Sequence, residues 1–188
     1  MPEIPLRPGA LRTAAGRLSR LTGLGVEIIG GTLILAPPRR GKHAGTVERL
    51  RARLDAGLPD GFAAYQCSSL GMPGDQDDYA TPDLVALPVD WDGDERRFAD
   101  PHEAALAVEV VPRSKGARDV TVKSDWYAAA GVRALLVLDP RDGTWTLRTD
   151  PCDGAYLGTV RGKYGEPVVP AAPLPEGLRT DGLPLYTG

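Results

Sequence analysis

The stretch ALAVEVVPRSKGARDVTVKSDWY, residues 105–127, decides how this chain folds. It opens with an almost continuous apolar run, which is typical of a strand buried on both faces of a sheet. A short basic connector follows, and the rest reads as a helix that ends at Ala130, before Gly131. A second apolar run, RALLVLD, occupies 133–139. This order predicts a helical crossover between two parallel strands at the centre of a mixed sheet.

The apolar run at 105–111 contains one carboxylate, Glu109, whose neighbours on both sides are apolar. A second run, DLVALPV at 83–89, begins with Asp83 directly after a proline. If the two strands are neighbours, a spacing of about 4.8 Å lets both carboxylates reach one ion. Two carboxylates and water form a hard oxygen site that suits Mg²⁺ or Mn²⁺. Lys123, on the following helix, would orient an attacking water or neutralise charge on a phosphate.

Each of these residues also has a structural interpretation. Asp83 could end a turn before its strand, and Glu109 could pair with a buried arginine. Asp119 and Lys123 stand four residues apart, as in an ordinary helical ion pair worth about 0.3–0.5 kcal/mol. We assign Asp119 mainly to capping the start of the helix. Only the joint occurrence of Asp83, Glu109 and Lys123 favours a catalytic site.

Upstream of this core the sequence predicts a hairpin and two helices. VEII and TLILA flank Gly30-Gly31, and both turn positions can take the positive φ that a tight hairpin needs. Helices are expected over about 10–21 and 43–57, and strands near 62–68 and 83–89. The basic residues of the first helix are interpreted as a solvated face. The segments GMPGDQDDYAT and WDGDERRFADPHE are expected to be loops.

Downstream, TWTLRT and AYLGTV alternate in the manner of an antiparallel strand pair, and the proline-rich tail from Gly165 is expected to be irregular. The fold class is therefore α/β with α+β character: a central mixed sheet flanked by helices, with an added hairpin and a late strand pair. We expect an N-terminal arm and short helix at 1–21 and a single domain at 22–188.

Composition limits the function. The chain of 188 residues is 42% hydrophobic and 25% charged, which is ordinary for a globular protein. A net charge of -3 provides no general attraction to nucleic acid, so any such contact must use a local basic patch. The two cysteines lack metal spacing. No signal-like or membrane-length apolar run is present in the sequence, so a cytoplasmic protein without membrane contact is expected.

The order of these motifs resembles the Uma-type family of endonuclease-like proteins, within the PD-(D/E)XK restriction-endonuclease-like superfamily. The resemblance rests on Pro82-Asp83, EVV at 109–111, the Asp119/Lys123/Tyr127 spacing, and the segments AAAGV and LLVLDP. It implies a central sheet flanked by helices and a divalent-metal site. Asp83 and Glu109 match the family's two metal-binding carboxylates. Lys123 matches the active-site lysine, moved from the strand to the following helix, because Val111 occupies the usual lysine position.

Two further positions match the family and are assigned auxiliary roles. Glu27 corresponds to an acidic position of the opening hairpin, where a solvent-facing strand residue is the alternative. His43 corresponds to a histidine near the start of a helix, where a helix-start hydrogen bond is favoured over catalysis. The connector Pro112-Arg113-Ser114-Lys115 departs from the family's Ser-Pro-Ser-Thr-like sequence, which adds two cations and removes hydroxyl groups.

These features predict a Mg²⁺- or Mn²⁺-dependent endonuclease that hydrolyses phosphodiester bonds in DNA, with Asp83, Glu109 and Lys123 as catalytic residues. A homodimer is expected, because cutting both strands needs two sites. The alternative is a nuclease-fold protein that no longer cleaves and serves as a binding module. Hydrolysis of another phosphate ester would use the same site and stays open.

Overall fold

The computed structural model describes residues 7–36, 40–113, 117–168 and 177–186, and for 117–119 it describes the backbone alone. The helices are α1 (Ala10–Thr22), α2 (Gly41–Gly57) and α3 (Ala117–Ala130), and a short 3-10 helix, η1, covers Val89–Gly93. In the described part of the chain, no helix has the length and apolar character needed to cross a membrane.

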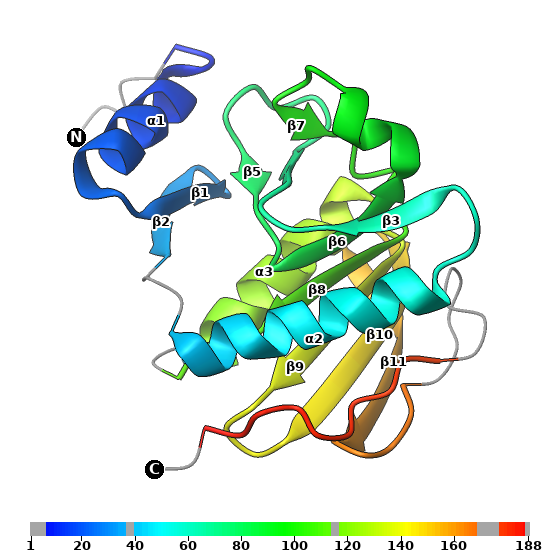
Figure 1. Cartoon of the computed structure of the whole chain (residues 1–188). Helices are drawn as coiled ribbons and strands as arrows, with labels where there is room; N and C mark the ends of the chain where they lie inside the picture. The colour runs from blue at the N-terminus through cyan, green and yellow to red at the C-terminus, as the bar shows by residue number, and fades with distance from the viewer. Residues whose placement is uncertain (1–6, 37–39, 114–116, 169–176, 187–188) are drawn as a thin grey trace.

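A six-stranded sheet forms the centre of the molecule (Figure 1). Its strand order is β11-β10-β9-β8-β6-β3. The strands are β3 (Phe62–Tyr65), β6 (Leu84–Pro88), β8 (Leu106–Val110), β9 (Ala134–Asp139), β10 (Thr144–Cys152) and β11 (Ala155–Lys163). β8 and β9 are parallel, and α3 connects them, whereas the other pairs are antiparallel. The predicted mixed sheet with a central parallel pair is confirmed.

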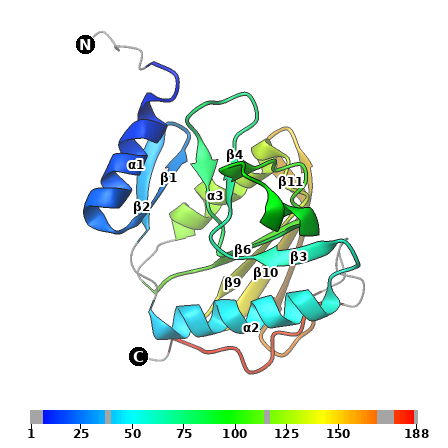
Figure 2. The ribbon, with the colours of Figure 1, turned by 45° about the horizontal axis from the view of Figure 1, so that its top comes forward.

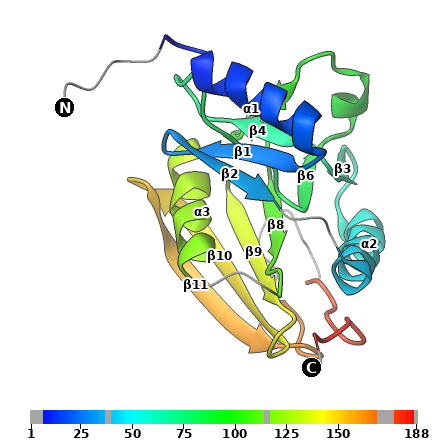
Figure 3. The same cartoon turned by 90° about the vertical axis from the view of Figure 1, so that its left-hand side faces the viewer.

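The two long helices cover opposite faces of this sheet, as Figure 3 shows with α3 on one side and α2 on the other. Alternating residues of the strands supply the two cores. Leu106, Val108 and Val110 of β8 pack in the cluster that contains Leu50 and Leu54 of α2. The alternate residues of β8, which include Ala107, point to the other face and pack in the cluster that contains residues of α3. Glu109 shares the parity of Ala107, so its side chain belongs to the α3 face.

A second, smaller sheet lies beyond one end of the large sheet (Figures 1 and 2). Its strand order is β2-β1-β5-β4-β7. The strands are β1 (Gly25–Ile29), β2 (Thr32–Ala36), β4 (Ser69–Gly71), β5 (Tyr79–Ala80) and β7 (Phe98–Ala99). Gly30 and Gly31 take φ of 57° and 71°, as the predicted hairpin turn requires. α1 packs on β1 through a core that includes Ala15 and Ile28.

This second sheet was not predicted, and it explains the misassigned segments. The expected strand at 62–68 ends at Tyr65, and Cys67 takes a positive φ of 58° where the chain leaves the large sheet for the small one. The two expected loops contain β5 and β7, and η1 runs from the end of the expected strand at 83–89 into the second loop. Arg12, expected to lie on a solvated face, donates to the carbonyls of Asp77 and Asp78 and stacks over the ring of Phe98.

Candidate active site

Asp83 and Glu109 come from neighbouring antiparallel strands of the large sheet. The register pairs Leu84 with Val108, and continuing it by one residue sets Asp83 opposite Glu109. A backbone hydrogen bond of 2.8 Å from Val110 N to Asp83 Oδ2 ties the start of β6 to the end of β8. The condition on which the sequence prediction depended, that these two strands are neighbours, is met.

Asp83 is buried, and both of its carboxylate oxygens have partners. Oδ2 accepts the Val110 amide, and Oδ1 lies 3.0 Å from Nε2 of His43, which reaches it from the first turn of α2. His43 is itself only 7% exposed. The expected helix-start hydrogen bond of His43 is therefore replaced by a contact to Asp83, because the ring points to the sheet rather than along its own helix.

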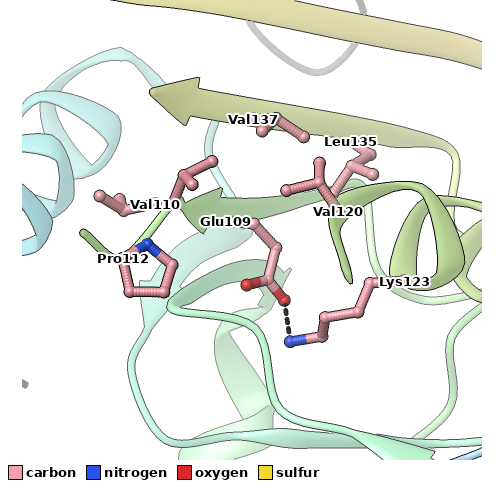
Figure 4. A pocket seen from close by; sticks show the side chains of 8 residues that line it. Glu109, Val110, Pro112, Val120, Lys123, Leu135 and Val137 are labelled. Carbon is pink, nitrogen blue, oxygen red and sulfur yellow. Dashed lines mark ion pairs between the residues drawn. The ribbon is translucent and has the colours of Figure 1, made fainter. Parts of the chain in front are cut away.

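Glu109 meets two side chains of α3. Its Oε1 accepts a hydrogen bond of 2.6 Å from the Tyr127 hydroxyl and lies 2.5 Å from the Lys123 ammonium. Lys123 and Tyr127 stand four residues apart, so one helical face presents both groups. Figure 4 shows the Glu109 and Lys123 side chains pointing toward one another. The contribution of Tyr127 was missed from sequence, where the four-residue spacing was the only signal.

Glu27 joins this group from the small sheet. Its Oε1 lies 2.9 Å from the Lys123 ammonium and accepts a hydrogen bond of 2.7 Å from the Thr81 amide. Glu27 is 4% exposed, so the alternative of a solvent-facing strand residue is wrong. The small sheet thus delivers a third carboxylate to the edge of the large sheet.

The cluster carries more negative than positive charge. Burial raises the pKa of Glu109; the nearby Lys123 opposes this rise, whereas Asp83 and Glu27 add to it. Burial works against the ammonium of Lys123, but the carboxylates of Glu109 and Glu27 outweigh burial and raise its pKa. Burial, followed by the charge of Glu109, holds the pKa of the Tyr127 hydroxyl well above its usual range. Lys123 is therefore a cation and Tyr127 a hydrogen-bond donor at neutral pH.

A cavity of about 30 Å³ adjoins Glu109 and Lys123 (Figure 4). Its other walls are the apolar residues Val110, Val111, Pro112, Val120, Leu135 and Val137. A space of this size holds about one water molecule. The pair of charged groups therefore has an apolar side, which lowers the local dielectric constant and strengthens their interaction.

The donor set fits a hard divalent cation. Two opposed carboxylates, Asp83 and Glu109, are the usual protein contribution to a Mg²⁺ site, which keeps several waters. Burial raises the pKa of Glu109, and the charges of Asp83 and Glu27 add to that rise, so a bound cation would favour the ionised carboxylate. Across the residues that the structure describes, no group of three His, Cys, Asp or Glu side chains is arranged to hold a metal ion. A cation bound here would therefore have to take its remaining ligands from water or backbone carbonyls.

Two further predictions concern the connector and Asp119. Pro112 borders the cavity, whereas Ser114 and Lys115 lie outside the described residues. The helix begins at Ala117, so Asp119 lies within its first turn rather than before it, and its side chain is outside the description. Among the described side chains, Lys123 pairs with Glu27 and Glu109, which come from other elements of the fold.

Comparison with known proteins gives a family and a fold. The model of the Uma2 family, described as "Putative restriction endonuclease", matches residues 17–185. Among solved structures, a protein of Anabaena variabilis described as "a putative nuclease belonging to DUF820" matches with a TM-score of 0.64 and 17% sequence identity. The match covers 80% of this chain and 83% of that one, and at this identity it shows a shared fold. No curated protein matches the chain.

Proposed function

Because this chain belongs to the Uma2 family of restriction-endonuclease-like proteins, we propose that it is a metal-dependent endonuclease that hydrolyses phosphodiester bonds in DNA. The family assignment supports a nuclease role, and this family generally uses divalent ions. The observation that carries the proposal is the opposition of Asp83 and Glu109 across β6 and β8, with Lys123 within 2.5 Å of Glu109. Mg²⁺ is the expected ion, with Mn²⁺ as a substitute.

The carboxylates of the site have distinct proposed roles. Asp83 and Glu109 bind the cation through oxygens whose orientation is fixed by the Val110 amide and the Tyr127 hydroxyl. When bound, a divalent ion polarises the scissile phosphate and makes a bound water more acidic. Glu27 also contacts the Lys123 ammonium and keeps it close to the carboxylates.

Lys123 acts as a cation. Its raised pKa means that it cannot accept the proton of the attacking water at neutral pH. The ammonium instead donates hydrogen bonds, either to the attacking water or to phosphate oxygens on which negative charge develops. The ammonium has three N–H donors, and its contacts with Glu27 and Glu109 need only two of them.

The direct test is cleavage of supercoiled and single-stranded DNA with Mg²⁺ or Mn²⁺, beside metal-ion binding by calorimetry. Asp83→Asn should abolish both ion binding and cleavage. Lys123→Met should keep ion binding, because it removes a competing cation, yet lose cleavage. Arg20→Met, which removes an exposed cation of α1, is the control and should behave as the wild type.

The outcomes separate the competing functions. A wild-type protein that binds no divalent ion and cuts no nucleic acid overturns the nuclease proposal. Ion binding without cleavage of any DNA or RNA form would favour the binding module. Activity confined to small phosphate esters would keep the site and change the substrate.

Double-strand cleavage would require two copies of this site, so we propose a homodimer as the active form. In the part of the chain that the structure describes, β11 is the last strand of the large sheet, and a strand edge of this kind can accept a second copy. Light scattering during size-exclusion chromatography measures the mass directly. A monomer that only nicks DNA would contradict the dimer and leave the proposed chemistry intact.

A further inference from the structure

The side chain of His43 contacts a residue far away in sequence as well as Asp83. Its Nε2 lies 3.0 Å from Asp83 Oδ1, and its Nδ1 lies 3.3 Å from the hydroxyl of Tyr186. Tyr186 and His43 are 143 positions apart. The proposed chemistry uses neither side chain, although His43 contacts one of the two carboxylates that it requires and Tyr186 contacts His43.

The C-terminal segment that carries Tyr186, residues 177–186, is held firmly on α2. Lys42, Arg49 and Arg53 are spaced by seven and four residues and so share one helical face. Arg53 donates to the carbonyls of Arg179 and Asp181. The same face continues toward the site, where Arg49 donates to the Gly182 carbonyl and Lys42 to that of Leu185. Figures 1 and 2 show the segment running alongside the helix.

Apolar contacts and backbone bonds fix the segment further. Leu178 and Leu183 are buried in the core between α2 and the large sheet. The Tyr186 amide donates to the Pro140 carbonyl at 2.8 Å, which attaches the segment to the turn after β9. The segment is therefore anchored on α2 and on the turn after β9. These contacts set the position of the Tyr186 hydroxyl beside the His43 ring.

Hydrogen-bonding chemistry then orients the histidine. A neutral imidazole has one donor and one acceptor nitrogen, and a hydroxyl that donates to one fixes the proton on the other. Burial, with the charges of Asp83 and Asp139, raises the pKa of Tyr186, so its hydroxyl keeps the proton that it donates. The contacts themselves leave the tautomer open, and a Tyr186 hydroxyl that donates to Nδ1 would leave the ring proton on Nε2, which faces Asp83 Oδ1.

We propose that Tyr186 is a positioning residue of the candidate active site: through His43, its hydroxyl fixes the Asp83 carboxylate for the divalent cation. This inference rests on the proposed function, since it assigns a role to Asp83 as an ion ligand. It makes the C-terminal segment a part of the site rather than a covering of α2. Residues behind a metal ligand typically change affinity by about 10- to 100-fold when removed.

The test compares Tyr186→Phe with the wild type in Mn²⁺ binding measured by calorimetry. The variant removes one hydroxyl and keeps the ring, and we expect the Kd for Mn²⁺ to rise about 10-fold. Tyr164→Phe is the matched control, because the Tyr164 hydroxyl is buried without a hydrogen-bond partner among the described residues. Its Kd should equal that of the wild type.

A second comparison separates positioning from mere support of the fold. In a His43→Gln background the path from Tyr186 to Asp83 is interrupted, so adding Tyr186→Phe should leave the Mn²⁺ Kd unchanged. If the two substitutions instead have independent effects that multiply, Tyr186 acts through the general stability of the segment, and the positioning role is overturned.

The ring proton offers a readout that needs no metal. The chain has two histidines, so the ¹⁵N spectrum of the imidazoles at alkaline pH can be assigned with the His43→Gln variant. We expect the Nε2–H tautomer in the wild type and a displaced Nδ1 resonance in Tyr186→Phe. A proton on Nδ1 would overturn the proposal. Equal Mn²⁺ affinity in wild type and Tyr186→Phe also overturns it and leaves the nuclease proposal standing, whereas no Mn²⁺ binding by the wild type overturns both.

Discussion

Two regions of this molecule gather carboxylates, and they satisfy them in different ways. In the loop before β5, Asp78 accepts hydrogen bonds from the amides of Gly30 and Gly31 at 2.6 and 2.9 Å. Asp77 accepts from the amides of Gly9 and Arg12, both at 2.8 Å. This acidic loop therefore binds backbone donors, and it holds the hairpin and the start of α1 in place.

The candidate active site has few such backbone donors. Glu109 meets a hydroxyl and an ammonium, and Lys123 is shared between Glu109 and Glu27. The pKa values of the two regions are shifted in opposite directions. Hydrogen bonds from the amides of Asp78 and Asp77 lower the pKa of Asp75, whereas burial raises the pKa of Glu109. Carboxylates paired with amides stabilise a fold, and carboxylates left with excess charge are suited to bind a cation.

The largest expected effect comes from neutralising an acid of the site. Glu109→Gln keeps the size of the side chain but removes a charged ligand, so divalent-ion-dependent DNA cleavage should fall about 10³-fold. Initial rates of plasmid cleavage measure this, with exposed Glu95→Gln as the control. Cleavage within threefold of wild type would mean that Glu109 is no ligand.

The acidic loop should respond in the opposite way. Asp78→Ala leaves the amides of Gly30 and Gly31 without their acceptor, and each lost hydrogen bond costs about 1 kcal/mol. We expect the free energy of unfolding in urea to fall by about 2 kcal/mol, with Mn²⁺ affinity kept. Asp60→Ala, an exposed turn residue, is the control. A loss of ion binding without loss of stability would erase the distinction between the regions.

Hydrophobic periodicity predicted which residues of the candidate site lie on neighbouring buried strands. It did not predict the residues that short strands bring to the site. Asp83 begins one apolar run and Glu109 lies within another, both runs are long enough to indicate buried strands, and the register of the two residues follows from strand pairing. Glu27 depends on the small sheet, whose strands β5 and β7 have two residues each and carry no periodic pattern. Its burial was therefore not predictable.

Other contacts of the site are non-local in a way that no local pattern encodes. The hydroxyl of Tyr186 reaches His43 across 143 positions, and its segment has no regular element to announce where it runs. Tyr127 lies nearer, at 18 positions from Glu109, and its helical spacing from Lys123 was visible. The spacing showed that Lys123 and Tyr127 lie on one face of a helix. Only the fold showed that this face contacts Glu109.

A smaller effect is expected from the donor that Glu109 shares with α3. Tyr127→Phe removes the hydroxyl that donates to Glu109 Oε1 at 2.6 Å and keeps a ring that is fully buried. Without this donor the carboxylate is no longer held in one orientation, so the Mn²⁺ Kd should rise about 10-fold. Calorimetry measures it, with Tyr164→Phe again as the control. An unchanged Kd would assign Tyr127 to packing alone.

The smallest effect is a pair of opposite pH dependences in metal-free protein, measured as the free energy of unfolding in the presence of a chelator. The folded state binds the Glu109 proton more tightly than the unfolded chain does, although Lys123 opposes this. Its contribution to stability is therefore full below the usual value near 4.5 and is lost as pH rises through the raised pKa. Subtracting the profile of Glu109→Gln isolates that decline.

Asp75 has the opposite sign. Its pKa is lowered from the usual 3.8, so its contribution is present above that value and is lost as pH falls through the lowered pKa. Because the side chain is exposed, solvent screens the effect, and the Asp75→Asn difference profile should be shallow. If the difference profiles of Glu109→Gln and Asp75→Asn have the same sign, the carboxylates of the acidic loop and those of the candidate site do not differ in how their ionisation affects stability. Opposite signs would show that the two groups of carboxylates differ in energetics as well as in geometry. Ionisation of Glu109 would then lower the stability of the metal-free protein, and a bound cation would restore that stability.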